Sequence, residues 1–268
     1  MIEVPPPTGI RMDCVSGTPL CGKTTIRKIL QYASCYLAGF HWFDSSDHII
    51  EWHKDPANNS PFHDAFIAAN KLSSAGNLIN DTLMNNALYF YLHAQMKLHG
   101  DVRHVTLFGF PRKRLQIKAI LDIDPNAGIF FIDATQDEAE ANRLRRIEEG
   151  STRPDDQPGP FAQRWKRCVE PNGTRDELMA FGKEHPGQFT LIPFSWKLGR
   201  RVAVIANKMN VEITERTSII KQINTAESEA CRRIEKIDGP RIRVHPTSPS
   251  QNLQPQASLS RLSGAMAS

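Results

Sequence analysis

Eight residues near the start of the chain have the types and the spacing of a loop that binds phosphate. They run from Gly17 to Thr24, in the order GTPLCGKT, and fit the pattern GxxxxGK(S/T) at every fixed position. The glycines let successive backbone N–H groups point inward, and the N-terminus of a following helix adds partial positive charge. Lys23 would reach the terminal phosphates, and the Thr24 hydroxyl would be a ligand of Mg²⁺. The loop therefore predicts a bound nucleoside triphosphate.

The segments around this loop predict the elements that must position it. Residues 11–16 are apolar enough for a buried strand, and residues 24–30 predict a helix, which is the order that the motif requires. Four more short apolar segments predict buried strands, with helical stretches between them, at residues 40–43, 104–108, 128–132 and 188–192. This alternation predicts a five-stranded parallel sheet with helices on both faces and ligands at the carboxyl ends of the strands.

Helix signals agree with this layout. Thr135 and Glu138 form a capping box directly after the fourth strand, and Gly150 can end the helix that it opens. Arg143 and Arg146 stand three residues apart in that helix and so share one face.

Composition restricts the class of protein. The chain has 268 residues, of which 40% are apolar, enough for one sizeable core. Five cysteines without a CxxC pair, and a short proline-rich extension over residues 1–10, predict a cytoplasmic protein without a membrane span. The net charge is +4, but the segment 239–268 holds three arginines and no acidic residue, so the remaining chain is nearly neutral. We expect a monomer that binds neither nucleic acid nor membrane.

The C-terminal region changes in character. Residues 200–209 predict a helix after the fifth strand, and apolar residues then recur at steps of three and four over 211–238, which predicts one more amphipathic helix. That helix would pack against the body of the protein or bind a partner. The segment 239–268 is rich in Ser, Pro and Gln and is expected to be disordered.

More residues that can bind phosphate follow the third and fourth predicted strands. Gly109-Phe110-Pro111-Arg112 comes first, with Gln116 four residues on, and the later set is Arg143, Arg153-Pro154-Asp155-Asp156 and Arg164. Together with the segment 76–81, they resemble the adenylate kinase family of nucleoside monophosphate (NMP) kinases from about residue 11 to about 209. The resemblance implies a P-loop NTPase fold over residues 11–210, with a small NMP-binding lobe at about 44–80 and a short lid at about 147–160.

The resemblance also implies a role for each matching residue. ATP would be bound by Gly17, Thr18, Pro19, Leu20, Cys21, Gly22, Lys23, Thr24, Thr25 and Arg143. AMP would be bound by Ser45, Asn77, Leu78, Ile79, Gly109, Arg112, Gln116, Arg153 and Arg164, with Gln116 recognising the adenine base. The catalytic residues would be Lys23, Arg112, Arg143, Arg153 and Arg164, while Asp155 and Asp156 would hold the lid closed. Only nine residues separate Arg143 from Arg153, so the lid is of the short type and needs no zinc.

The chemistry of phosphate transfer agrees with these residue types. Transfer between two phosphate compounds brings several negative charges together, and catalysis consists mainly of neutralising that charge and aligning the groups. Arginines suit this task, since their planar guanidinium groups bind phosphate oxygens in a bidentate manner and stay charged. The nucleophile would be an anionic phosphate oxygen, which requires no general base.

Three positions depart from the family pattern. Phe108 replaces the aspartate that usually precedes GFPR, so Mg²⁺ would depend on Thr24, the phosphates and either Asp13 or Asp133. Ile50 falls where the family has an arginine for the acceptor phosphate, and Lys54 or His48 could substitute. Leu20-Cys21 replaces the usual glycine-serine pair of the loop, where backbone N–H groups bind the phosphates.

The function expected from the sequence is transfer of the γ-phosphoryl group of Mg-ATP to AMP, giving two ADP. A first alternative is a kinase of the same fold for another nucleoside monophosphate. A second alternative, suggested by Phe108 and Ile50, is a nucleotide-binding module with weak or no transferase activity.

Overall fold

The computed structural model describes residues 2–33, 37–73, 79–150 and 156–211, all within one compact unit. The predicted amphipathic helix over 211–238, apart from its first residue, and the predicted disordered segment 239–268 lie outside the described residues. Within the described ranges, no helix is both long and apolar enough to span a lipid bilayer.

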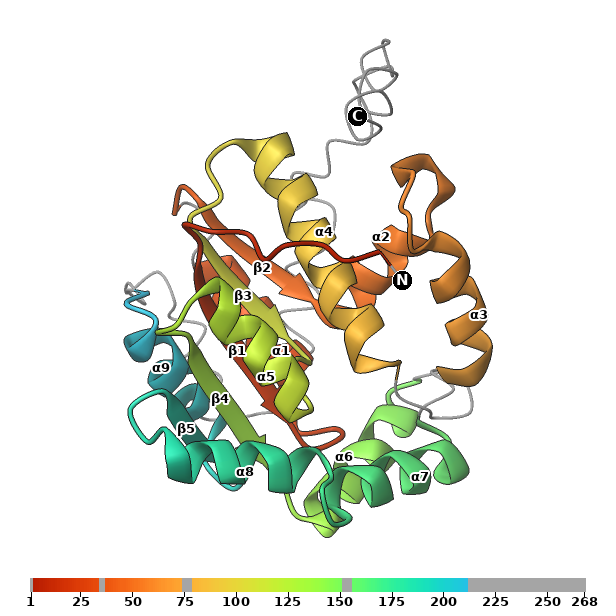
Figure 1. Cartoon of the computed structure of the whole chain (residues 1–268). Coiled ribbons are helices and arrows are strands. Elements are labelled where there is room, and N and C mark those ends of the chain that lie inside the picture. The colour runs from red at the N-terminus through yellow and green to blue at the C-terminus, as the bar shows by residue number, and fades with distance from the viewer. Residues whose placement is uncertain (1, 34–36, 74–78, 151–155, 212–268) are drawn as a thin grey trace, which may run out of the picture. The chain divides into compact units, whose positions relative to one another are not determined.

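The centre of the fold is a parallel sheet in the order β2-β3-β1-β4-β5 (Figure 1). Its strands are β1 (Arg11–Gly17), β2 (Phe40–Asp44), β3 (His104–Phe108), β4 (Gly128–Asp133) and β5 (Phe189–Pro193). The five predicted strands are confirmed, each within one residue at either end. From β1 the chain passes β3 to reach β2 at one edge of the sheet. From β3 it passes β1 in the opposite direction to reach β4. A crevice therefore opens at the carboxyl ends of the adjacent strands β1 and β3.

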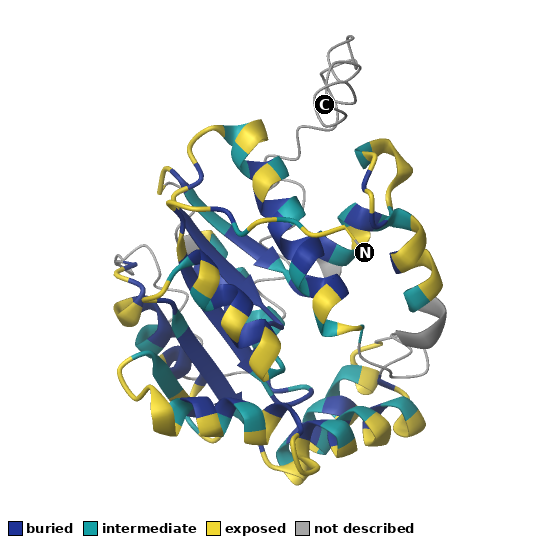
Figure 2. Ribbon diagram, in the orientation of Figure 1, coloured by how far each residue is buried: buried dark blue, intermediate teal, exposed yellow. Residues whose placement is uncertain are grey.

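Helices cover both faces of this sheet, as expected from the alternating pattern. One face carries α1 (Lys23–Ala33) and α9 (Leu198–Lys208), which contact each other. The other face carries α4 (Asp81–His99), α5 (Arg114–Ile123) and α8 (Thr174–Glu184), packed in that order. The strands between these layers are largely buried, as Figure 2 shows.

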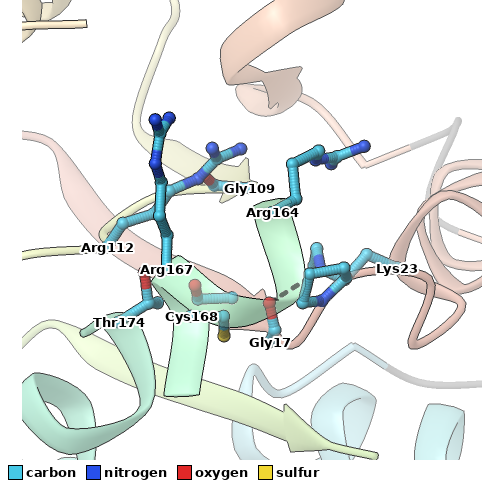
Figure 3. A pocket seen from close by; sticks show the side chains of 10 residues that line it. Gly17, Lys23, Gly109, Arg112, Arg164, Arg167, Cys168 and Thr174 are labelled. Carbon is cyan, nitrogen blue, oxygen red and sulfur yellow. Dashed lines mark hydrogen bonds between the residues drawn. The ribbon is translucent and has the colours of Figure 1, made fainter. Parts of the chain in front are cut away.

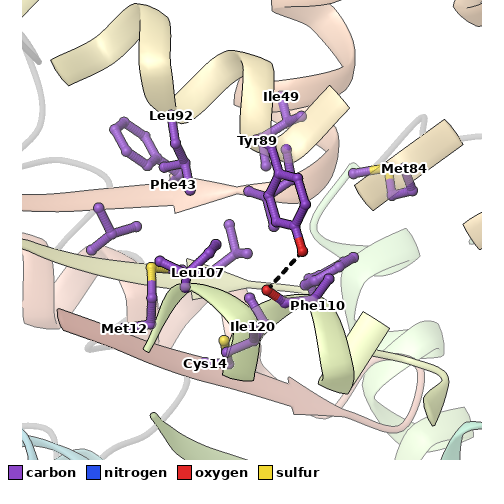
Figure 4. Packing of buried hydrophobic residues seen from close by; sticks show 14 of the residues in the cluster. Met12, Cys14, Phe43, Ile49, Met84, Tyr89, Leu92, Leu107, Phe110 and Ile120 are labelled. Carbon is purple, nitrogen blue, oxygen red and sulfur yellow. Dashed lines mark hydrogen bonds between the residues drawn. The ribbon is translucent and has the colours of Figure 1, made fainter. Parts of the chain in front are cut away.

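The main apolar core lies between the sheet and the layer of α4, α5 and α8. Met12 and Leu107 from the strands meet Tyr89 and Leu92 from α4 and Ile120 from α5 (Figure 4). The Tyr89 hydroxyl donates a hydrogen bond of 3.1 Å to the Ala119 carbonyl, so its polar end is also satisfied inside the core. This packing holds α5, the helix that follows the turn after β3, against the sheet and α4.

A small helical region is inserted between β2 and α4. A π-helical turn (Ser45–Ile50) leads into α2 (Glu51–Lys54), a 3₁₀ turn (Pro56–Asn58) and α3 (His63–Ser73). His53 joins these pieces, since its ring is hydrogen-bonded to the Ser60 hydroxyl and lies 2.9 Å from the Ala87 carbonyl of α4. This is the region where the sequence predicts a small lobe.

Two further helices lie between β4 and α8. In α6 (Gln136–Glu148) the predicted capping box is confirmed: the Thr135 hydroxyl accepts from the Glu138 amide at 3.3 Å, and the Glu138 carboxylate accepts from the Thr135 amide at 2.8 Å. The next helix is α7 (Pro158–Val169). Most of the predicted lid lies between them, and its residues 151–155 are outside the described ranges.

Candidate functional site

The phosphate loop follows β1 at the carboxyl edge of the sheet and is tied to β4. The Thr18 amide donates to the Ile132 carbonyl at 3.1 Å, and the Thr18 hydroxyl accepts from the Ala134 amide at 3.0 Å. Inside the loop, Leu20 and Gly22 have φ angles of 58° and 83°. The left-handed conformation is ordinary for a glycine but strained for a leucine. The loop has the curved backbone that phosphate binding needs, although one of its residues with a left-handed conformation, Leu20, is not a glycine.

Lys23 lies within the curl of this loop. Its ammonium group donates to the Gly17 and Thr18 carbonyls, at 3.0 and 2.9 Å, and to the Cys21 sulfur at 3.1 Å. From the side of α9, the Arg201 guanidinium donates to the Cys21 carbonyl at 3.3 Å. The terminal phosphates of a bound nucleotide would exchange these carbonyl contacts of Lys23 for ionic ones, which are stronger.

A pocket beside the loop brings together residues from three distant parts of the chain (Figure 3). The chain contributes the phosphate loop, the turn after β3, and the facing parts of α7 and α8. The residues that line it are Ser16, Gly17, Pro19, Lys23, Gly109, Arg112, Arg164, Arg167, Cys168 and Thr174. Four of these ten carry a fixed positive charge, and none of the ten is acidic. This excess of positive charge favours the binding of an anion.

Arg112 is held in place by the turn that follows β3. Its Nε donates to the Gly109 carbonyl at 2.9 Å, and its backbone amide donates to the Gln116 side chain at 2.7 Å. Burial lowers the pKa of the Arg112 guanidinium, and the positive charge of Arg164 lowers it further. Two positive guanidinium groups near each other repel, so an anion bound between them would relieve an unfavourable interaction.

Ser45 and Gln116 both lie against this turn. The Ser45 hydroxyl lies so close to Gly109 that a side chain at that position would meet it at 2.9 Å, and Gly109 has a φ of +76°. Gln116 is buried, and its amide nitrogen donates to the Asp81 carboxylate at 2.6 Å while its oxygen accepts from Arg112. The glutamine predicted to recognise adenine thus also joins the Arg112 turn to the start of α4.

Arg143 does not line the pocket with Arg112 and Arg164. It is buried, forms two hydrogen bonds of 2.8 and 2.6 Å with the Glu140 carboxylate, and donates to the Asp156 carbonyl at 2.9 Å. The bond with Glu140 raises the pKa of the Arg143 guanidinium. The buried Asp156 carboxylate in turn pairs with Arg146 at 3.0 Å. In this structure Arg143 links α6 to the segment before α7.

Several other predicted residues lie away from the pocket or outside the described chain. Thr24 and Thr25 stand in the first turn of α1, directly after Lys23. Ile79 packs against the main core. Four predicted residues lie outside the described ranges, namely Asn77, Leu78, Arg153 and Asp155.

The proposed substitutes for missing acceptor-site groups have other partners. Lys54 pairs with Glu51 at 2.7 Å, and the His48 ring accepts from the Asp44 amide at 3.0 Å. Neither Lys54 nor His48 is among the residues lining the pocket. Phe108 is fully buried, with its ring 5.9 Å from that of Trp42. The positive charge opposite the phosphate loop therefore comes from Arg112, Arg164 and Arg167 among the lining residues.

One of the two suggested carboxylates for Mg²⁺ is wrong. Asp13 lies level with Gly128, the first residue of β4, and accepts from the His104 ring at 2.7 Å, so it stands toward the amino ends of the strands. Asp133 lies at the correct edge, but Arg175 holds its carboxylate in a bidentate pair at 3.0 and 2.8 Å. Among the described residues, no group of three His, Cys, Asp or Glu side chains could hold a metal ion.

The sequence analysis missed four of the lining residues, Ser16, Arg167, Cys168 and Thr174. Arg167 follows Arg164 by three residues, and this spacing on one helix was a signal that could have identified it. Burial raises the pKa of the Cys168 thiol to about 11, so this sulfur is uncharged at neutral pH and is a poor nucleophile. The positive charge of the pocket favours an anionic ligand, and Cys168 is not suited to attack it as a nucleophile.

Comparisons with known proteins give little more. No model of a known protein family matches the chain, and no curated protein matches it. Among solved structures, the chain is similar to an unliganded sugar kinase from Janibacter sp. HTCC2649, with 11% sequence identity and a TM-score of 0.43. The match covers 75% of this chain and 95% of that one. This similarity is distant, and we infer no substrate from it.

Proposed function

We propose that the protein is a nucleoside monophosphate kinase of the adenylate kinase type, with a P-loop NTPase fold, that transfers the γ-phosphoryl group of Mg-ATP to AMP. The observation that carries this proposal is the pocket in which the phosphate loop and Lys23 meet Arg112 and Arg164. A triphosphate held by the loop would place its last phosphate beside these two arginines. This arrangement suits a reaction in which two phosphate groups must approach each other.

The composition of the pocket favours a phosphate acceptor over an alcohol. Transfer to a hydroxyl group is assisted by a base, commonly a carboxylate, that accepts its proton. None of the residues lining this pocket is Asp, Glu or His. An anionic phosphate oxygen needs no such base, and Arg112 and Arg164 would hold it in line with the transferred group.

The donors near the loop suit Mg²⁺ rather than a metal that needs a full protein shell. The Thr24 hydroxyl, next to Lys23 at the start of α1, would be its protein ligand. Because Mg²⁺ keeps several waters and binds phosphate oxygens, one or two protein ligands suffice. When bound, it would neutralise charge on the phosphates of ATP, while Lys23 and the arginines neutralise the rest.

Two alternatives have support in particular residues. Gln116 is the only predicted residue that favours AMP over other monophosphates. The predicted arginines would bind phosphate groups, so a kinase for another nucleoside monophosphate would use the same arginines. A nucleotide-binding module with weak or no transfer is favoured by Phe108, whose buried ring offers no acceptor to metal-bound water, and by Arg143, which already binds Glu140.

The test is a set of transfer assays on the purified full-length chain. ATP, Mg²⁺ and each of AMP, GMP, CMP, UMP and dTMP are supplied in turn, and formation of the diphosphates is measured. We expect turnover with AMP, reduced at least about 100-fold in Lys23→Ala and Arg112→Ala. Arg114→Ala, two residues from Arg112 but exposed on α5, is the matched control and should keep full activity. Equal rates in all variants would refute the assignment, and ATP binding without product would support the binding module.

A further inference from the structure

The wall of the pocket formed by α7 contains one more arginine than the family resemblance predicts. Arg164, Arg167 and Cys168 all line the pocket, and their spacing of three and four residues places them on one face of the helix. Lys166 and Val169, on other faces of the same helix, are exposed. The helix therefore turns two guanidinium groups toward the pocket and keeps its neighbouring lysine in solvent.

The two arginines of α7 do not have the same surroundings. In Figure 3, Arg164 stands toward Lys23, whereas Arg167 stands with Arg112 and Thr174 on the side of the pocket away from Lys23. Arg164 is close enough to Arg112 to lower its pKa. One turn of helix, about 5 Å, separates Arg164 from Arg167 along α7. Arg167 thus extends the positively charged lining of the pocket away from the phosphate loop, toward the side where the acceptor would bind.

We infer that Arg167 binds the phosphate group of the acceptor and is a specificity-determining residue for phosphorylated acceptors. This inference rests on the proposed function. A phosphate monoester carries about two negative charges at neutral pH, and planar guanidinium groups bind such an anion in bidentate fashion. Arg167 supplies this charge on the side of the pocket opposite Lys23, where Ile50, Lys54 and His48 supply none.

The experiment separates acceptor binding from donor binding. For the full-length chain, Arg167→Ala should raise the KM for AMP about 10- to 100-fold, the usual effect of losing a hydrogen-bonded contact with a charged group. The KM for ATP should change less than about two-fold, because Lys23 and the loop are untouched. Arg167→Lys keeps the charge without the planar fork and should restore part of the loss. Lys166→Ala, on the exposed face of α7, should match the unaltered protein.

A second measurement distinguishes failure of this inference from failure of the proposed function. Binding of AMP without ATP is followed by calorimetry in the same four proteins. Binding that weakens in Arg167→Ala, without phosphoryl transfer in any protein, would support Arg167 and refute the kinase. Transfer with an unchanged KM for AMP in Arg167→Ala, or an equal rise in both KM values, would refute the role of Arg167 alone. Absence of both AMP binding and transfer in the unaltered protein would refute both.

Discussion

A buried histidine makes the stability of the inserted helical region depend on pH. His53 is fully buried, its ring is stacked 5.2 Å from that of Phe66, and both its nitrogens have partners, in Ser60 and Ala87. Burial lowers its pKa from the ordinary value of 6.5 to about 4. His53 is therefore neutral in the folded protein at any pH well above 4.

The direction and size of the effect follow from this difference. Between pH 6.5 and about 4 the unfolded chain holds a proton on His53 that the folded chain does not, so stability falls as pH falls through this window. Above pH 6.5 both states are neutral and the contribution is fully present. The full loss is roughly 3 kcal/mol, at 1.36 kcal/mol per pH unit. Between pH 7 and pH 5 it is roughly 2 kcal/mol, a large part of the 5–15 kcal/mol typical of a domain.

The assay is urea unfolding at pH 7 and pH 5, analysed at constant m-value. His53→Gln removes the titrating group, so its free energy of unfolding should fall by roughly 2 kcal/mol less than that of the unaltered protein between these two pH values. His93→Gln is the control, because His93 is exposed on α4, where its ring lies 3.0 Å from the Pro5 carbonyl. It should show the full pH dependence.

The pH dependence of His53→Gln can refute the shifted pKa of His53. If His53→Gln lost as much stability between pH 7 and pH 5 as the unaltered protein, His53 would titrate alike in both states. Its burial among Phe66, Ser60 and Ala87 would then not keep it neutral.

Two further predictions concern the loop and the amino edge of the sheet. Leu20→Ala and Leu20→Gly both remove the packed side chain, but only glycine relieves the strain of the left-handed φ of 58°. The glycine variant should therefore be more stable than the alanine variant by about 1 kcal/mol in thermal unfolding. The reverse order of stability would contradict a strained backbone at Leu20. Asp13→Asn weakens the buried contact with His104 and should lower the free energy of unfolding by about 1–3 kcal/mol. The rate of phosphoryl transfer at 20 °C should stay unchanged. A large loss of rate in the folded variant would indicate that Asp13 takes part in the reaction.

Backbone elements were predictable from the sequence because their signals are local. The three inner strands β1, β3 and β4 are short apolar runs buried on both faces, and such runs between helices are typical of parallel sheets. The position of the site followed from the same reasoning, since motifs after β1 and β3 meet at the carboxyl edge of the sheet. The family resemblance predicted Arg112 and Arg164, which are 52 positions apart in the sequence, at one site, and both line the pocket.

Side-chain partners were less predictable because competing groups lie close in space but not in sequence. Asp13 belongs to the strand that leads into the phosphate loop, yet at about 3.3 Å per residue it is more than 10 Å from Gly17. Asp133 stands at the right edge, but its partner Arg175 lies in the first turn of α8, 42 residues later. Arg143 has a carboxylate one helical turn before it, at Glu140. That last competitor was visible in the sequence, whereas the pairing of Asp133 was not.

The phosphate loop shows why a departure from a motif can be tolerated. Leu20 takes a conformation that favours glycine, but its side chain packs against the cluster of Ala139, Phe161 and Trp165, and its carbonyl accepts from Asn142 at 2.7 Å. The apolar contact of the Leu20 side chain and the hydrogen bond to α6 offset the strain of its backbone. A glycine at this position would have no such strain, but it would also lack the apolar contact. Phe161 and Trp165 belong to α7, the helix that also carries Arg164 and Arg167. Leu20 thus joins the loop predicted to bind the donor to the arginines predicted to bind the acceptor, so a shift of α7 would change both sides of the pocket together.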